Sequence, residues 1–130
     1  MLSINFNNNL PIHEQIKRRI EELILNGVLE KDSALPSVRE LACSLAINPN
    51  TVQKAYFALE SDGITYSVAG KGRFVALHPD ELKKAKAEEE LKAIRANVEK
   101  LYNYGFSKKD VMIFIEDYIK EIKERSNKDD

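Results

Sequence analysis

The sequence has a single cysteine among its 130 residues, so an intramolecular disulfide is impossible. That residue, Cys43, falls on the predicted polar side of its helix. We interpret it as a small residue without a chemical role, while a redox switch and an intersubunit bridge stay open as alternatives. No apolar run approaches the length needed to span a bilayer, and the N-terminus lacks a basic region followed by an apolar core. We therefore expect a cytoplasmic protein without an export signal.

The sequence also lacks the residue groupings that enzymes and metal sites require. Its two histidines, His13 and His78, lie far apart in the chain and do not cluster with other metal ligands. No nucleophile and base, and no paired carboxylates, stand at a spacing that indicates catalysis. A Walker phosphate loop is excluded because six residues, rather than four, separate Gly63 from Gly70. We expect neither an enzyme nor a bound metal or cofactor.

Residues 37–62 have the pattern of two short helices joined by a tight turn. Ser37 and Glu40 form a predicted capping box, which starts the first helix at Ser37. In the turn at residues 48–50, short polar side chains can supply turn hydrogen bonds and a helix N-cap. A second helix should then begin near Thr51 and end at Asp62, because the following glycine closes helices well.

A longer amphipathic helix is predicted upstream, at residues 11–26. Proline suits its first turn, and Gly27 ends it. Five apolar residues recur on its buried side: Ile12, Ile16, Ile20, Leu23 and Ile24. Before this helix, Ile4 and Phe6 alternate with polar residues, which indicates either an extended arm packed on the body or a frayed terminus.

Residues 64–77 have strand periodicity and predict a hairpin. Ile64, Tyr66 and Val68 alternate with small or polar residues, and an apolar run returns after the glycine-rich turn at residues 69–72. Because a two-stranded hairpin is weak alone, it should pack on the helices. The predicted fold class is therefore mainly α with a small β-hairpin, arranged as a winged helix-turn-helix.

Several short motifs follow one another along these segments: Pro11-Ile12, Gln15-Ile16, Gly27, LPSVRELA at 35–42, NPNTVQKAY at 48–56, LESDGI at 59–64 and GKGRFV at 70–75. As an ordered set they resemble the GntR family of bacterial transcription regulators. The resemblance covers roughly residues 10–78, and the chain around it looks most like the short YtrA-like subfamily. It implies operator binding and repression of a nearby operon, often one that encodes an ABC transporter.

The resemblance places the predicted DNA contacts on the two short helices and the hairpin tip. Thr51 and Gln53 are the expected base readers, with Gln53 suited to a bidentate contact on adenine. The first turn of the second helix is expected to point its free amides and positive dipole end towards phosphate. Asn50 is expected to cap the helix, contact DNA, or both. Many family members carry an arginine where Pro49 and Gln53 stand, so this chain departs from the family at two places where guanine could be read. The full predicted set is Ser37, Arg39, Asn48, Asn50, Thr51, Gln53, Lys54, Gly70, Lys71 and Arg73.

Charge alone does not identify a DNA-binding domain here. The chain has 20 Lys and Arg against 21 Asp and Glu, and residues 1–78 contain eight of each sign. Arg39 and Lys54 are the expected phosphate contacts on the helices, although the resemblance also allows Arg39 a base contact. At the hairpin tip, glycines let the backbone approach the minor groove while Lys71 and Arg73 meet phosphates. We expect a local basic face with modest non-specific affinity.

The composition shifts to Lys, Glu and Ala after residue 79, which predicts two domains: a DNA-binding domain at residues 1–78 and a helical dimerisation domain at 79–130. The first tail helix carries a heptad-like seam of Ala87, Leu91, Ile94, Val98 and Leu101. A second capping pair, Ser107 and Asp110, starts the next helix. Its broad apolar face contains Val111, Phe114, Ile115, Tyr118, Ile119 and Ile122. Two such helices cannot enclose a core, so we expect a homodimer, with folding back onto the same chain as the alternative.

The sequence therefore predicts a nucleoid-associated repressor that binds a palindromic operator on double-stranded DNA as a homodimer. The alternative is a winged-helix adaptor that binds another protein through Phe57 and the hairpin. The near-neutral charge favours the adaptor slightly, whereas Lys71 and Arg73 argue against it. No polar cluster identifies a small-molecule effector.

Overall fold

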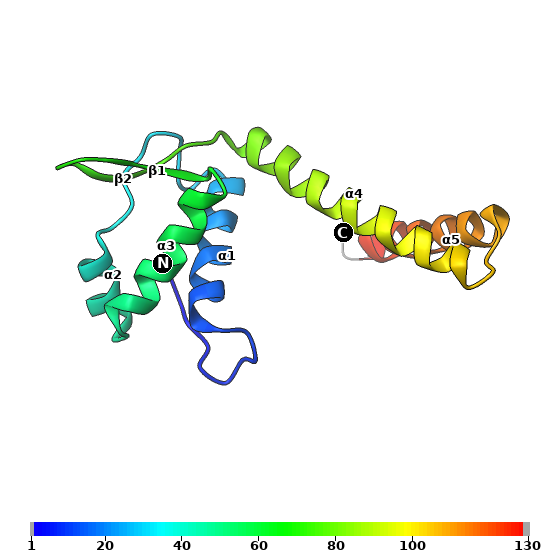
Figure 1. The fold of residues 1–130 in the computed structure, drawn as a ribbon, viewed down its shortest axis with the longest axis horizontal. Coiled ribbons are helices and arrows are strands. Elements are labelled where there is room, and N and C mark those ends of the chain that lie inside the picture. Colours follow the sequence, from blue (N-terminus) through cyan, green and yellow to red (C-terminus); the bar gives the residue numbers. More distant parts are fainter. Residues whose placement is uncertain (1, 129–130) are drawn as a thin grey trace. The chain divides into compact units, whose positions relative to one another are not determined.

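The computed structural model describes residues 2–128, in which five helices and one antiparallel hairpin form (Figure 1). The fold class predicted from the sequence is confirmed: a winged helix-turn-helix is followed by two C-terminal helices. Residues 1 and 129–130, the outer ends of the two predicted domains, lie outside the described residues. In chain order the elements are α1 (Ile12–Leu25), α2 (Val38–Leu45), α3 (Pro49–Ser61), β1 (Thr65–Val68), β2 (Gly72–Val75), α4 (Pro79–Asn103) and α5 (Lys108–Lys128).

The chain divides into two compact units, Met1–Lys86 and Ala87–Asp130. In the first unit, the apolar stripes of α1, α2 and α3 meet the base of the hairpin in one core. Leu82, from the second turn of α4, is only 1% exposed and belongs to this core. The first eight residues of the predicted tail domain, 79–86, therefore belong to the first unit and pack with the winged helix.

Of the five apolar residues expected on the inner side of α1, four are buried and Ile12 is partly buried; all but Leu23 pack in the shared core. Gly27 follows the helix at φ 76°, as a helix-ending glycine should. The extended arm before α1 is held by Gln15, whose side-chain amide bonds the backbone N–H and C=O of Asn5, each at 2.9 Å. Of the two alternatives, the packed arm holds for Ile4, which packs on the core, but not for Phe6, which is 65% exposed.

The helix-turn-helix starts as predicted, but its second helix begins earlier. Ser37 caps α2, since its Oγ accepts a hydrogen bond of 3.1 Å from the Glu40 amide. In contrast, α3 begins at Pro49 rather than near Thr51, with Asn48 as its N-cap. The sequence prediction placed this proline in the turn at residues 48–50, whereas proline fits the first helical position, where no amide partner is needed.

The hairpin pairs Thr65 with Val75 and Val68 with Gly72. Only its base reaches the core: Thr65 is 3% and Val75 0% exposed, whereas Val68 is 37% exposed. The predicted hairpin is thus confirmed, and burial decreases along its first strand from Ile64, which is buried, through Tyr66, which is partly buried, to Val68. The loop before α2 adds backbone bonds to β2, including Leu35 N–H to Arg73 C=O at 2.9 Å.

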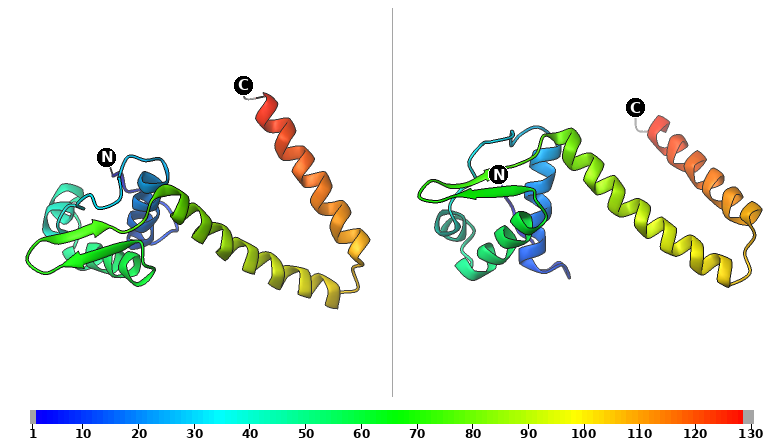
Figure 2. Two further views of the ribbon diagram at one scale, coloured as in Figure 1. Left: turned by 90° about the horizontal axis from the view of Figure 1, so that it is seen from above. Right: turned by 45° about the horizontal axis from the view of Figure 1, so that its top comes forward.

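In the second unit, a short turn joins α4 to α5 (Figure 2). Gly105 ends α4 at φ 92°, and the predicted capping pair forms in both directions. The Asp110 amide donates to Ser107 Oγ at 3.1 Å, and the Ser107 amide donates to Asp110 Oδ2 at 3.0 Å. These bonds hold the pKa of Asp110 below its usual range. The sequence therefore located this helix start correctly.

Candidate DNA-binding surface

The two helices of the motif are fixed to each other by Tyr56, a buried residue of α3 to which the sequence analysis gave no role. Its hydroxyl donates a hydrogen bond of 2.7 Å to the carbonyl oxygen of Pro36, two residues before α2. The ring is 1% exposed. Burial raises the pKa of Tyr56 to about 12, so the hydroxyl remains a donor at any physiological pH. One side chain thus holds the start of α2 against α3.

Two of the predicted contacts lie at the start of α2. Ser37 is exposed, but its hydroxyl oxygen already serves as the helix cap. Arg39, two residues later, is exposed, and no carboxylate of residues 2–128 forms an ion pair with it. Of the two, only Arg39 has its whole functional group available to a partner.

The start of α3 has fewer free amides than we expected. Pro49 has no amide hydrogen, and the Asn50 amide donates to Asn48 Oδ1 at 2.9 Å. The Thr51 amide donates to the Asn48 carbonyl oxygen at 3.0 Å. The idea that the first turn offers free N–H groups to phosphate was therefore wrong, because Asn48 satisfies them. The positive end of the helix dipole remains.

The remaining predicted residues of α3 differ in exposure. Asn50 and Lys54 are exposed, whereas Thr51 and Gln53 are partly buried. Asn50 stands inside the first turn, so it does not cap the helix, and of its two predicted roles only DNA contact is left. Contact of these four side chains with DNA stays a prediction.

At the tip of the hairpin, Gly70 and Gly72 have φ values of 75° and 114°, which L side chains rarely adopt. Between them Lys71 is exposed. We expected Arg73, like Lys71, to extend from the hairpin tip. Instead, its side chain lies over two aromatic rings of α3. Its guanidinium carbon lies 5.3 Å from the ring centre of Tyr56 and 5.5 Å from that of Phe57.

The distribution of ion pairs explains how a neutral domain can present a basic surface. On α1, three consecutive cations are paired with carboxylates: Lys17 with Asp62, Arg18 with Glu14 and Arg19 with Glu22. The hydrogen bond to Asp62 raises the pKa of Lys17. None of the ion pairs within residues 2–128 includes Arg39, Lys54 or Lys71. The negative charge of the domain is thus partly neutralised on α1, away from the predicted contacts.

Other kinds of site find no support in the described part of the chain. Residues 2–128 contain no group of three or more His, Cys, Asp or Glu side chains that could hold a metal ion. Within the same residues, no helix is long and apolar enough to cross a membrane. Cys43 is exposed, in agreement with its predicted place on α2.

Comparison with known proteins gives a consistent result. Residues 12–75 match the family described as "Bacterial regulatory proteins, gntR family". The HTH-type transcriptional repressor YtrA of Bacillus subtilis (strain 168) is 43% identical over 76 residues, which are 58% of this chain and 58% of that protein. The chain therefore spans less than two thirds of this relative's length.

Two solved structures extend the comparison. YtrA from Sulfolobus acidocaldarius, a GntR-family transcription factor, aligns with a TM-score of 0.56 at 33% identity, over 70% of this chain and 97% of that one. The DNA-binding domain of AraR in complex with operator ORX1 aligns with a TM-score of 0.53 at 34% identity, over 58% of this chain and 96% of that one.

Proposed function

Because this chain belongs to the gntR family of bacterial regulatory proteins, we propose that it is a DNA-binding transcription regulator that acts as a repressor. It binds double-stranded operator DNA through α2, α3 and the hairpin. The likeness to the repressor YtrA supports repression, and the likeness to an operator-bound AraR domain supports DNA as the partner. Its relatives are named as regulators of transcription and not as enzymes. Binding of chromosomal DNA implies a cytoplasmic location.

The observation that carries this proposal is the set of unpaired cations around the helix-turn-helix. Arg39 on α2, Lys54 on α3 and Lys71 at the hairpin tip are all exposed, and each comes from a different element. Backbone phosphates are bound mainly by such side chains, which fix the position of the protein on the duplex. Gln53 on α3 then supplies base recognition, with adenine as its preferred partner.

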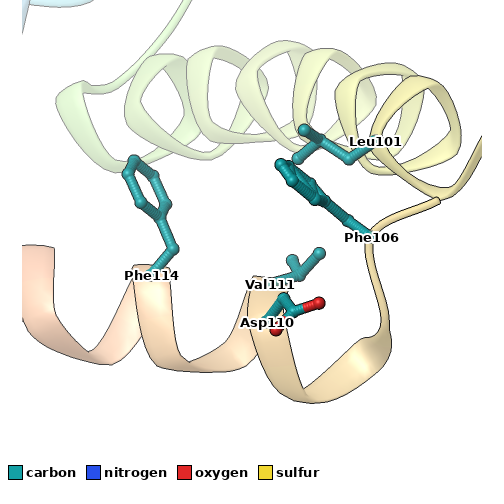
Figure 3. Close-up of a pocket in the computed structure, with 5 residues that line it drawn as sticks. All are labelled: Leu101, Phe106, Asp110, Val111 and Phe114. Atoms are coloured by element: carbon teal, nitrogen blue, oxygen red, sulfur yellow. The ribbon is translucent and has the colours of Figure 1, made fainter. Parts of the chain in front are cut away.

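We also propose that the second unit makes the protein a homodimer, on the evidence of its exposed apolar side chains. No residue of α5 among those described is buried, and Phe114 is 70% exposed. A cavity of about 480 Å³ opens between α4 and α5, lined by Leu101, Phe106, Asp110, Val111 and Phe114 (Figure 3). Its lining is predominantly apolar, and apolar surface of this kind is stabilised by a partner. A second copy of the tail is the occupant that the heptad-like seam of α4 favours.

A dimer sets the form of the operator. Two copies related by a two-fold axis present their α3 helices to successive major grooves, about 34 Å apart. The operator is accordingly palindromic or nearly so. The YtrA-like resemblance implies a target, which we include in the proposal. This target is an operon that lies near the gene for this protein and encodes an ABC transporter.

Selection of bound sequences from a random duplex pool tests this function. The full chain is incubated with the pool at physiological salt, and the retained duplexes are sequenced. We expect enrichment of a two-fold symmetric motif with half-sites about one helical turn apart. Retention without a motif would contradict sequence-specific regulation. No retention would favour the adaptor function, in which the exposed ring of Phe57 contacts a protein instead.

A further inference from the structure

Arg73 and Phe57 are in contact across the junction between the hairpin and α3. The guanidinium of Arg73 comes from β2 and lies over two aromatic rings of α3, those of Tyr56 and Phe57. Successive residues of a helix point about 100° apart. A group within reach of both rings therefore sits in the angle between them, where its position is restricted from two sides.

Phe57 lies outside the core of the first unit. It is 57% exposed, whereas Tyr56 beside it is 1% exposed and is fixed by its hydrogen bond to Pro36. An exposed phenylalanine gains little from burial, but its ring face attracts a guanidinium. The contact with Arg73 is thus the interaction that the ring makes on this surface.

The guanidinium itself lacks an acceptor. Arg73 Nη1 is buried without a hydrogen-bond partner, and no carboxylate of residues 2–128 forms an ion pair with Arg73. A buried donor without an acceptor costs free energy. The side chain as a whole is partly exposed, and a guanidinium has five donors in a planar fork that matches phosphate. The arrangement holds a cation in place while leaving its charge uncompensated.

We propose that Phe57 positions the Arg73 guanidinium for a DNA backbone phosphate at the junction of α3 and the hairpin. Phe57 is then a positioning residue that acts through Arg73, and Arg73 is the group that touches DNA. This inference rests on the proposed DNA-binding function. It also gives the exposed aromatic ring a role in DNA binding, in place of the protein contact that the adaptor function requires.

Salt dependence of DNA binding separates these roles, because each phosphate that is neutralised contributes about 0.9 to the slope of log K against log salt concentration. The full chain and its variants are titrated with a selected operator duplex or, if none is enriched, with a random-sequence duplex of about 30 bp. Arg73→Gln should lower the slope by about one and the affinity about fivefold at about 0.15 M salt. Phe57→Leu changes no charge, but it should also lower both the salt slope and the affinity, because it releases the Arg73 guanidinium.

The pair should behave as one unit. The double variant should bind no more weakly than Arg73→Gln alone, since Phe57 acts only through Arg73. Phe57→Tyr should keep the slope of the unaltered protein, because a tyrosine ring also attracts a guanidinium. As a matched control, Phe6→Leu makes the same substitution at another exposed phenylalanine, 65% exposed, and should change nothing. Circular dichroism of each variant checks that the helices are intact.

Three results would overturn the inference. An unchanged slope in Arg73→Gln would mean that Arg73 meets no phosphate. Weaker binding by Phe57→Leu at an unchanged slope would mean that the ring contacts DNA or another group directly, and unchanged binding would mean that it has no part. If the unaltered protein shows no salt-dependent binding, the proposed function itself fails, which is distinguishable from these outcomes.

Discussion

Glu21 of α1 and Lys86 of α4 form an ion pair, in which 5% of the Glu21 side chain and 36% of the Lys86 side chain are exposed. With Leu82, one helical turn earlier, the pair holds the first two turns of α4 on the winged helix. A carboxylate buried to this degree is stable only with a cation beside it, because desolvation of an unpaired charge is costly.

Removal of the cation should therefore destabilise the first unit. We expect Lys86→Met to lower the free energy of unfolding by about 1 to 3 kcal/mol, measured by urea denaturation at neutral pH. Lys84→Met is the matched control, because Lys84 is exposed on the same helix; it should stay within about 0.5 kcal/mol of the unaltered protein. Equal effects of the two substitutions would show that the ion pair contributes nothing.

The sequence predicted the elements whose signals are local. The cap at Ser37, the reciprocal capping pair at Ser107, Gly27 and the apolar stripe of α1 each depend on residues within about two turns, and the structure contains them. Of the capping box predicted at Ser37, only the bond from the Glu40 amide to Ser37 Oγ is present among the described residues. The burial of Glu21 was not predictable in this way. Its partner is Lys86, far along the chain, and nothing near Glu21 distinguishes it from a solvent-exposed helix carboxylate.

The sequence predicted which elements carry the candidate site. It did not predict what each side chain does there. The start of α3 was misplaced because Asn48 and Asn50 are equally good caps in sequence, and only the backbone bonds distinguish them. The stacking of Arg73 could not be anticipated either, since it depends on how the hairpin packs over α3. The first is an error about where a helix begins, decided by local bonds of Asn48, whereas the second concerns packing between two elements.

Stability at high pH should depend on Tyr56. Its pKa is raised to about 12 in the folded state, against about 10 when unfolded, so the neutral form is favoured by folding. The associated stability is fully present below about pH 10 and is lost as the pH rises from about 10 towards 12, by up to about 3 kcal/mol. Urea unfolding of the unaltered protein and of Tyr56→Phe should diverge accordingly, with only the unaltered protein losing this contribution. Parallel pH profiles would contradict the prediction.

Dimerisation should require the second unit. A chain that ends at Glu90 retains Leu82 and Lys86, and hence the contacts that complete the first unit. We expect it to be a folded monomer with weak operator binding, while the full chain is a dimer by light scattering. In the full chain, Phe114→Glu should weaken the dimer by placing a charge on the exposed apolar face of α5. A truncated chain that remains dimeric would place the interface in the winged helix instead.

Arg39 and Lys71 should contribute to affinity but not to folding. Each is exposed and forms no ion pair within residues 2–128, so Arg39→Ala and Lys71→Ala should leave helical content and dimerisation unchanged. Each should weaken DNA binding about fivefold at about 0.15 M salt and lower the salt slope by about one. Lys31→Ala is the control, because Lys31 is exposed but lies beside His78 and Pro79, close to the start of α4. Unaltered affinity in either variant would remove that residue from the surface.

Base recognition should depend on Gln53 more than on its cationic neighbour. A bidentate contact with adenine contributes about 1 to 3 kcal/mol of discrimination, so Gln53→Ala should lose the preference at one base pair of each half-site and keep it elsewhere. Lys54→Ala, one residue along α3, should weaken binding to all sequences alike, because a phosphate contact carries no sequence information. Repeating the selection with both variants distinguishes these effects. If the Gln53 variant enriches the same motif as the unaltered protein, recognition lies with Asn50, Thr51 or Arg39.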